Sequence, residues 1–140
     1  MTRTDVSPLA LTRDECLGHL ALASVGRVLM SARAMPAAIP VRFALVGERV
    51  VFWADARDHP ETIADNTVVG FQADEIDPIT HGGWSVHVVG VASHVRQPDV
   101  FAALEGSTPR GWTDGTGPLI SLSLELVTGR RLSNNLEEMK

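Results

Sequence analysis

Alternating apolar and polar residues occupy much of the chain and predict strands more often than helices. Within residues 39–46 every second residue, from Ile39 to Leu45, is apolar, which is the spacing of a strand with one buried face. The pair Gly47-Glu48 then predicts a tight hairpin turn. The six strands predicted in this way are residues 27–32, 39–46, 49–54, 67–73, 84–95 and 119–128.

Two of these strands carry more detailed predictions. Residues 84–95 are expected to kink or bulge near Gly90, because the apolar alternation weakens there. Residues 119–128 are expected to form one half-buried strand, with the apolar residues from Ile120 to Leu126 on a single face. Residues 74–83, with an Asp77-Pro78 pair, are predicted to form a polar loop.

Helices are predicted at three places and all of them are short. Thr12 and Glu15 have the spacing of a capping box, in which each side chain binds a backbone amide of the first helical turn. The apolar face of this helix begins at Cys16, and Gly26 is expected to end the unit. Further helices are predicted from Asp58 to about Asn66 and over residues 99–104.

Long alternating strands with few helices indicate a mainly β fold. The favoured architecture is a six-stranded antiparallel barrel, and the alternative is an open sheet with helices on one face. The chain has 140 residues, of which 44% are hydrophobic and 21% charged, so a single domain over residues 1–140 is expected, with its core at about 10–132.

Charge and composition narrow the classes of function. The net charge of −5 argues against nucleic-acid binding, and no apolar run is long enough for a transmembrane helix. The N-terminal residues lack the pattern of a signal peptide, so a cytoplasmic location is expected. The five histidines and the lone Cys16 show no metal-ligand spacing, and no nucleophile, Walker or dinucleotide-binding motif is present.

Two places have residues suited to binding a small molecule. Arg57, Asp58 and His59 follow the strand that ends at Trp53, and the helix expected there would point its free amides at this turn, as in a phosphate site. Asp58 can instead cap that helix, with Arg57 and His59 in solvent. Trp84 follows two glycines and can stack on a cofactor, fill a dimer seam or simply pack in the core.

Several segments resemble the small bacterial branch of the pyridoxamine 5′-phosphate oxidase-like flavin-binding proteins, which includes nitroimidazole-resistance proteins. The segments are residues 71–78, 83–92 and 127–131, together with 39–43 and the following hairpin arm 51–53. The resemblance extends over about residues 10–132. The Gly-Trp-Ser-Val stretch that begins at Gly83 is its most specific part.

The resemblance implies a split β-barrel that forms a homodimer with two flavin mononucleotide (FMN) sites between the subunits. The resemblance also includes relatives that bind a deazaflavin or haem in place of FMN. The residues expected to contact the cofactor are Arg42, Trp53, Ala54, Arg57, Asp58, His59, Trp84 and Ser85. No catalytic residue and no metal ligand is assigned.

This chain departs from the family pattern at the turn expected to hold the phosphate. Trp53 and Ala54 stand where relatives often have arginine and threonine, and a carboxylate, Asp58, stands near the turn. Three functions are therefore weighed. They are an FMN-dependent oxidoreductase of unknown substrate, a non-catalytic binding protein for flavin, deazaflavin or haem, and a cofactor-free dimer.

Overall fold

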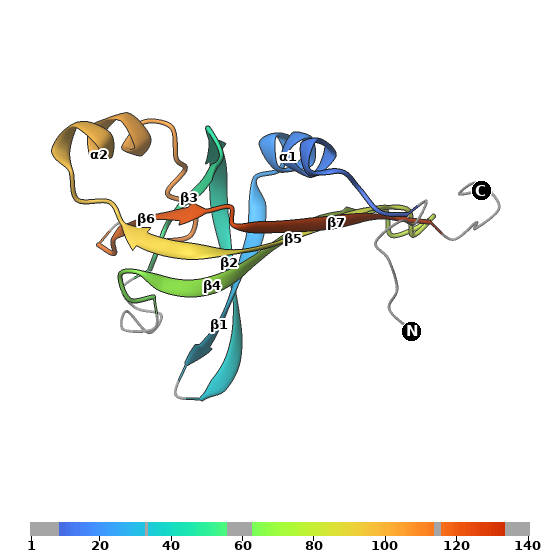
Figure 1. Ribbon diagram of the computed structural model, residues 1–140, viewed down its shortest axis with the longest axis horizontal. Coiled ribbons are helices and arrows are strands. Elements are labelled where there is room, and N and C mark those ends of the chain that lie inside the picture. Colours follow the sequence, from blue (N-terminus) through green and yellow to red (C-terminus); the bar gives the residue numbers. More distant parts are fainter. Residues whose placement is uncertain (1–8, 33, 56–62, 114–115, 134–140) are drawn as a thin grey trace.

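The computed structural model describes residues 9–32, 34–55, 63–113 and 116–133, and its elements are shown in Figure 1. The elements are α1 (Arg13–Leu22), β1 (Val25–Ala32), β2 (Met35–Val46), β3 (Arg49–Trp53), β4 (Thr67–Ile76), β5 (Gly83–His94), α2 (Pro98–Glu105), β6 (Leu119–Ser123) and β7 (Leu126–Leu132). Neither α1 nor α2, the helices within the described ranges, is long and apolar enough to cross a membrane.

Six of the strands close into an antiparallel barrel. The order around it is β4-β1-β2-β3-β6-β5, and β5 pairs back onto β4. The predicted mainly β fold with a six-stranded antiparallel barrel is confirmed, and the open sheet is excluded by the β4–β5 pairing. The seventh strand, β7, continues beside β5 past the end of β6.

The barrel interior is filled by the inward-facing residues of each strand. Phe43, Phe52 and Phe71 are at most 2% exposed, and the rings of Phe43 and Phe71 meet edge to face at a centroid distance of 4.9 Å. Burying a side chain of this size contributes roughly 1.5–3 kcal/mol. On β2 the alternation predicted from the sequence holds, because Val41 and Phe43 are buried while Arg42 between them is exposed.

Helix α1 begins with the predicted capping box. The Thr12 hydroxyl accepts a hydrogen bond from the Glu15 amide, and the Glu15 carboxylate accepts one from the Thr12 amide at 2.8 Å. These bonds lower the pKa of Glu15 below its usual value. Cys16 and Leu20 of this helix are buried in the core. Gly26 does not end the helical unit as predicted, since α1 ends at Leu22 and Gly26 lies within β1.

The irregularity predicted as a kink or bulge of β5 near Gly90 is not a bulge in β5 itself, because the ladder between β4 and β5 passes through Gly90 without interruption. The irregularity lies in the opposite strand. Leu122 pairs with Ala92 and Leu126 pairs with Val89, so three residues on one side face two on the other. This extra residue is a bulge that separates β6 from β7.

The bulge also corrects the prediction of one straight strand over residues 119–128. One extra residue reverses which face the following side chains occupy. As a result Leu126 is 58% exposed, and Val127 packs against the core in its place. The Ser123 hydroxyl accepts a hydrogen bond from the Val91 amide at 2.9 Å, which satisfies a donor beside the bulge.

Other boundaries also differ from the predictions, and β2 for example begins at Met35 rather than at residue 39. Strand β4 extends to Ile76, so Asp74 and Glu75 belong to a strand and the predicted loop over residues 74–83 is shorter. Of the helix predicted from Asp58, residues 58–62 lie outside the described residues, and residues 63–66 form a bend and a turn. The short helix predicted over residues 99–104 is confirmed as α2.

Gly90 is predicted to tolerate no side chain, because a Cβ atom there would lie 1.6 Å from the carbonyl oxygen of Ser123. Gly90→Ala should lower the free energy of unfolding by about 2 kcal/mol or more, since the bulge has to move. Gly18→Ala is the matched control, because nothing lies within 4 Å of a Cβ at that helical position. It should raise stability by up to ~1 kcal/mol. Equal urea midpoints for the two variants would contradict this account.

Candidate functional site

A pocket lies where β2 and β3 separate. Their ladder runs from Val46 paired with Arg49 to Phe43 paired with Phe52, and stops there. Beyond this point β2 pairs with β1 alone, while Trp53 of β3 pairs with Leu119 of β6. The two strands of the hairpin thus follow different neighbours, and a slot opens between them.

The slot is lined mainly by apolar and aromatic residues. The lining comes from residues on both sides of the split and from two further segments: Ile39, Pro40, Val41, Arg42, Phe52, Trp53, Ala54, Asp55, Ile63, Trp112 and Thr113. Of the eight predicted site residues, the structure brings Arg42, Trp53 and Ala54 together here. An apolar slot with a few polar groups is typical of sites that bind small molecules.

Arg42 supplies a positive charge at the slot. Its side chain is exposed, because it faces outward between the buried Val41 and Phe43. The described ion pairs join Arg13 to Glu48, Arg96 to Asp65 and Arg110 to Glu105, and no described residue pairs with Arg42. A guanidinium held beside an apolar slot is suited to binding the carboxylate or phosphate of a ligand.

Trp53 is 4% exposed and belongs to a small apolar cluster on the outside of the barrel, together with Val51 and Leu119. The ring of Phe101 from α2 meets it edge to face at 5.7 Å, and the guanidinium of Arg110 lies 4.0 Å above its ring centroid. Its indole N–H is buried, and the described part of the chain offers it no hydrogen-bond acceptor. Buried donors are rarely left without a partner, so this N–H remains available to an acceptor from a ligand.

Hydrogen bonds link the side of the slot that contains Ile63 to the end of β5. A ring nitrogen of His94 lies 2.7 Å from the Ile63 carbonyl oxygen, and the His94 amide donates to the Asp65 carboxylate at 2.8 Å. Arg96 also donates to that carboxylate, at 2.5 Å. These bonds hold the pKa of Asp65 below its usual value. The ionised carboxylate therefore helps to fix this wall.

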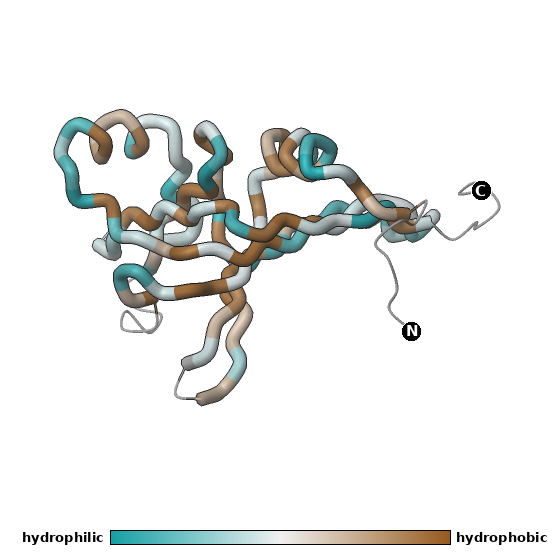
Figure 2. Tube along the Cα trace, in the orientation of Figure 1, coloured by the Kyte–Doolittle hydropathy of each residue, from teal (hydrophilic) through white to brown (hydrophobic). Residues whose placement is uncertain are grey.

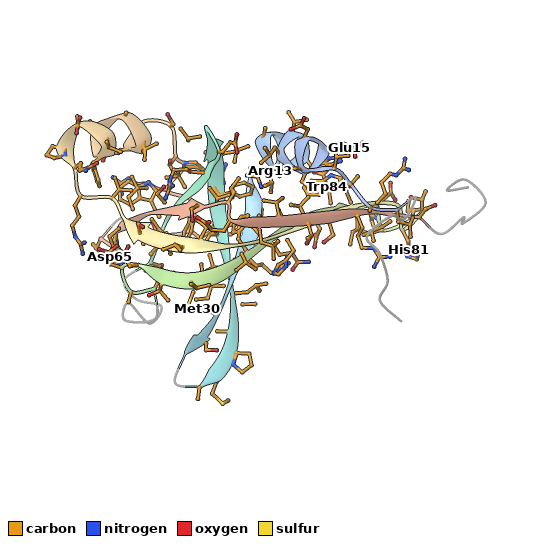
Figure 3. The ribbon with its side chains drawn as sticks, in the orientation of Figure 1. Arg13, Glu15, Met30, Asp65, His81 and Trp84 are labelled. Carbon is orange, nitrogen blue, oxygen red and sulfur yellow. The ribbon has the colours of Figure 1, made fainter. Side chains whose placement is uncertain are left out.

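Trp84 and Ser85 are not at the slot within one chain. The Trp84 ring stacks on His19 of α1 at a centroid distance of 4.6 Å, and the Ser85 hydroxyl lies 3.3 Å from the Gln72 side-chain nitrogen. Figure 3 shows Trp84 beside α1, at the other end of the sheet from Asp65. That these two residues contact a cofactor stays a prediction, and it needs a second subunit to bring them to a slot.

The remaining predicted site residues, Arg57, Asp58 and His59, lie outside the described residues, so the phosphate turn expected there stays a prediction. Among the described residues, no group of three or more histidine, cysteine, aspartate or glutamate side chains gathers to hold a metal ion. Burial raises the pKa of the Cys16 thiol, which keeps it protonated and unreactive.

Sequence reasoning missed the contribution of Ile63, Trp112 and Thr113 to the slot. Trp112 and Thr113 come from a segment far from the β2–β3 hairpin in the sequence, and none of the elements predicted from the sequence placed them or Ile63 at the slot. Trp112 did carry a signal, since a tryptophan within a run rich in glycine and proline is unusual for a solvent-exposed loop.

The fold and the slot can now be set beside known proteins. A family model described as pyridoxamine 5′-phosphate oxidase matches residues 12–131. This chain belongs to the pyridoxamine 5′-phosphate oxidase family. The resemblance seen in the sequence is therefore confirmed over nearly the whole barrel.

Individual relatives agree with this membership. The chain is 32% identical over 127 residues to the uncharacterised protein Rv0080 of Mycobacterium tuberculosis, which covers 87% of this chain and 84% of that protein. It is 26% identical to an FAD-binding protein of Mycobacterium smegmatis, with a TM-score of 0.73 and coverage of 89% and 98%. A FAD- and haem-binding protein of the same organism is 11% identical, has a TM-score of 0.70 with coverage of 90% and 74%, and shares the fold.

Replacing Asp65 by asparagine should destabilise the protein only above acidic pH. Because folding lowers the pKa of Asp65 from 3.8, its contribution is present above that value and is lost as the pH falls through the folded pKa. Asp65→Asn should therefore lower the melting temperature at pH 7, and the difference from the wild type should shrink as the pH falls below 3.8. Glu75→Gln, at an exposed position on β4, is the control. A melting difference that stays constant from pH 7 to pH 2 would contradict this role.

Proposed function

We propose that this protein binds a flavin, in the first place FMN, at the slot between β2 and β3, and acts as a flavin-dependent oxidoreductase on a small molecule. The observation that carries the proposal is Arg42, which is exposed beside an apolar slot and unpaired among the described residues. Membership of the family and the FAD-binding relative from M. smegmatis support it.

The residues at the slot fit a flavin. Its phosphate needs a cationic or amide donor, and Arg42 offers a guanidinium that no described residue occupies. Its ring system is flat and largely apolar, and the slot walls include Phe52, Ala54 and Trp112. The buried N–H of Trp53 has no described acceptor, and the heteroatoms of a flavin can supply one.

The flavin, when bound, supplies the redox chemistry, and the protein supplies binding, orientation and electrostatics. Arg42 would hold the phosphate and so fix the position of the ring. The apolar walls would keep water away from the ring, because they offer water molecules no hydrogen-bonding partners.

A second copy of the chain completes the proposed site. The slot between β2 and β3 has a volume of about 50 Å³ in one chain, whereas ligand pockets usually enclose several hundred Å³. The hairpin of β1 and β2 projects from the barrel (Figure 1), and its residues are largely apolar near the tip (Figure 2). Met35 on this hairpin and Val68 on β4 are both 66% exposed, as expected for surfaces that another subunit covers.

Two other functions remain as outcomes of experiment. A non-catalytic protein of the same fold would bind flavin, deazaflavin or haem without turning over a reductant. A cofactor-free dimer would bind none of them. Titration of the purified protein with FMN, riboflavin, a deazaflavin and haem, followed by an assay of reductant oxidation by the loaded protein, separates the three.

Wild-type protein should quench FMN fluorescence with a Kd in the micromolar range or below. A micromolar Kd corresponds to a binding free energy of about −8 kcal/mol. Arg42→Met should weaken FMN binding by roughly 10- to 100-fold, because a hydrogen bond to a charged group is lost. Its affinity for riboflavin, which lacks the phosphate, should stay within about twofold. Arg13→Met, on α1 and away from the slot, is the control. If FMN at about 100-fold above the micromolar range leaves its fluorescence unquenched by the wild type, the proposed function is overturned.

The protein should sediment as a dimer at micromolar concentration, because the exposed apolar surfaces would be buried between two copies. Sedimentation velocity should give about twice the 15.1 kDa mass of one chain. A compact monomer that nonetheless binds FMN tightly would show that one chain holds the whole site and would exclude a role for Trp84 and Ser85 of a second chain.

A further inference from the structure

One short segment contacts both sides of the split between β2 and β3. Residues 110–113, called the strap from here on, lie in the loop between α2 and β6. On the β3 side, the guanidinium of Arg110 lies over the ring of Trp53. On the β2 side, the backbone of Gly111 lies against Arg42, and Trp112 and Thr113 line the slot itself.

The contact at Gly111 is close enough to fix the position of Arg42. A Cβ atom at Gly111 would lie 2.9 Å from the Cβ and Cγ atoms of Arg42 and 3.1 Å from its Cδ atom. These atoms are the stem of the arginine, near its backbone, so the clash cannot be relieved by moving the end of the side chain. Gly111 also has a φ of +66°, a conformation that favours glycine. The absence of a side chain here thus lets Arg42 follow its present course.

The exposed fraction of Trp112 is 57%, although this residue lines the slot. Large aromatic residues are usually more buried than this, unless a ligand or partner covers them. The neighbouring contact of Arg110 on Trp53 anchors the strap on the β3 side. A cation above an aromatic face is attracted to the electron-rich ring, which stabilises this contact.

We propose that the strap selects the ligand: Trp112 stacks on the flat ring of the bound flavin, and Gly111 is a positioning residue that directs Arg42 to the phosphate. This inference rests on the proposed function and adds to it the part of the slot that recognises each half of the ligand. The ligand class that follows is a planar heteroaromatic ring carrying an anionic group.

The two halves of the proposal have different signatures in binding. Removing the stacking surface should weaken ligands with and without the phosphate to the same degree. Trp112→Ala should therefore raise the Kd of FMN and of riboflavin by about tenfold each, because stacking on an aromatic side chain is worth roughly a factor of ten or more. Trp112→Phe should restore most of the affinity.

Displacing Arg42 should instead remove the preference for the phosphate. Gly111→Ala should lower the ratio of riboflavin Kd to FMN Kd toward that of Arg42→Met, and leave riboflavin affinity nearly unchanged. Gly47→Ala is the matched control, since Gly47 has a φ of +63° but no atom within 4 Å of a Cβ. It carries the same backbone strain without touching Arg42, and its ratio should equal that of the wild type.

The experiment is fluorescence titration of the full-length wild type and of each variant with FMN and with riboflavin, with melting temperature and sedimentation measured alongside. Suppose that the wild type binds FMN and that Trp112→Ala and Gly111→Ala have the wild-type Kd for both FMN and riboflavin. The strap proposal then fails and the proposed function stands. Dissociation of a Trp112→Ala dimer with unchanged ligand affinity would also overturn it, since Trp112 would then be an interface residue. If the wild type binds neither ligand, both proposals fall.

Discussion

The ladder between β2 and β3 ends at Phe43 and Phe52, and beyond it β2 pairs with β1 while Trp53, the last residue of β3, pairs with β6. The remainder of the site depends on this divergence. A hairpin paired along its full length would have no slot between its strands and no space for Trp112. The strand partners β1 and β6 keep the separated backbones bonded, so the split leaves few buried donors or acceptors without partners.

The bulge opposite Gly90 serves the closure of the barrel in a related way. Strand β5 is long enough to pair with two successive strands on one side, and one extra residue in the partner lets β6 belong to the barrel while β7 extends beyond it. Gly90 faces the carbonyl of Ser123 at a distance that no side chain could occupy. The weakened apolar alternation near Gly90 therefore reflects a close backbone approach to the neighbouring strand.

The chemistry at the slot differs in kind on its two sides. The β2 side offers a guanidinium whose stem is held by the backbone of Gly111, and the β3 side offers aromatic surface capped by Arg110. In the proposed flavin site, binding strength would come from Arg42 and from contact with the ring, because Trp53 and Ala54 stand where the family resemblance leads us to expect arginine and threonine.

The alternation of residues 39–45, the Thr12 capping box and the Gly47 turn are local patterns, and the sequence alone determined the hairpin, the first helix and the barrel class from them. Through the family resemblance it also pointed to Arg42, Trp53 and Ala54 as cofactor contacts. The bulge at residues 123–125, the separation of β2 from β3 and the arrival of Ile63 and Trp112 at the slot were decided only by the tertiary structure. Each depends on pairing or packing between segments distant in sequence, and such contacts leave no periodic mark on the segment itself.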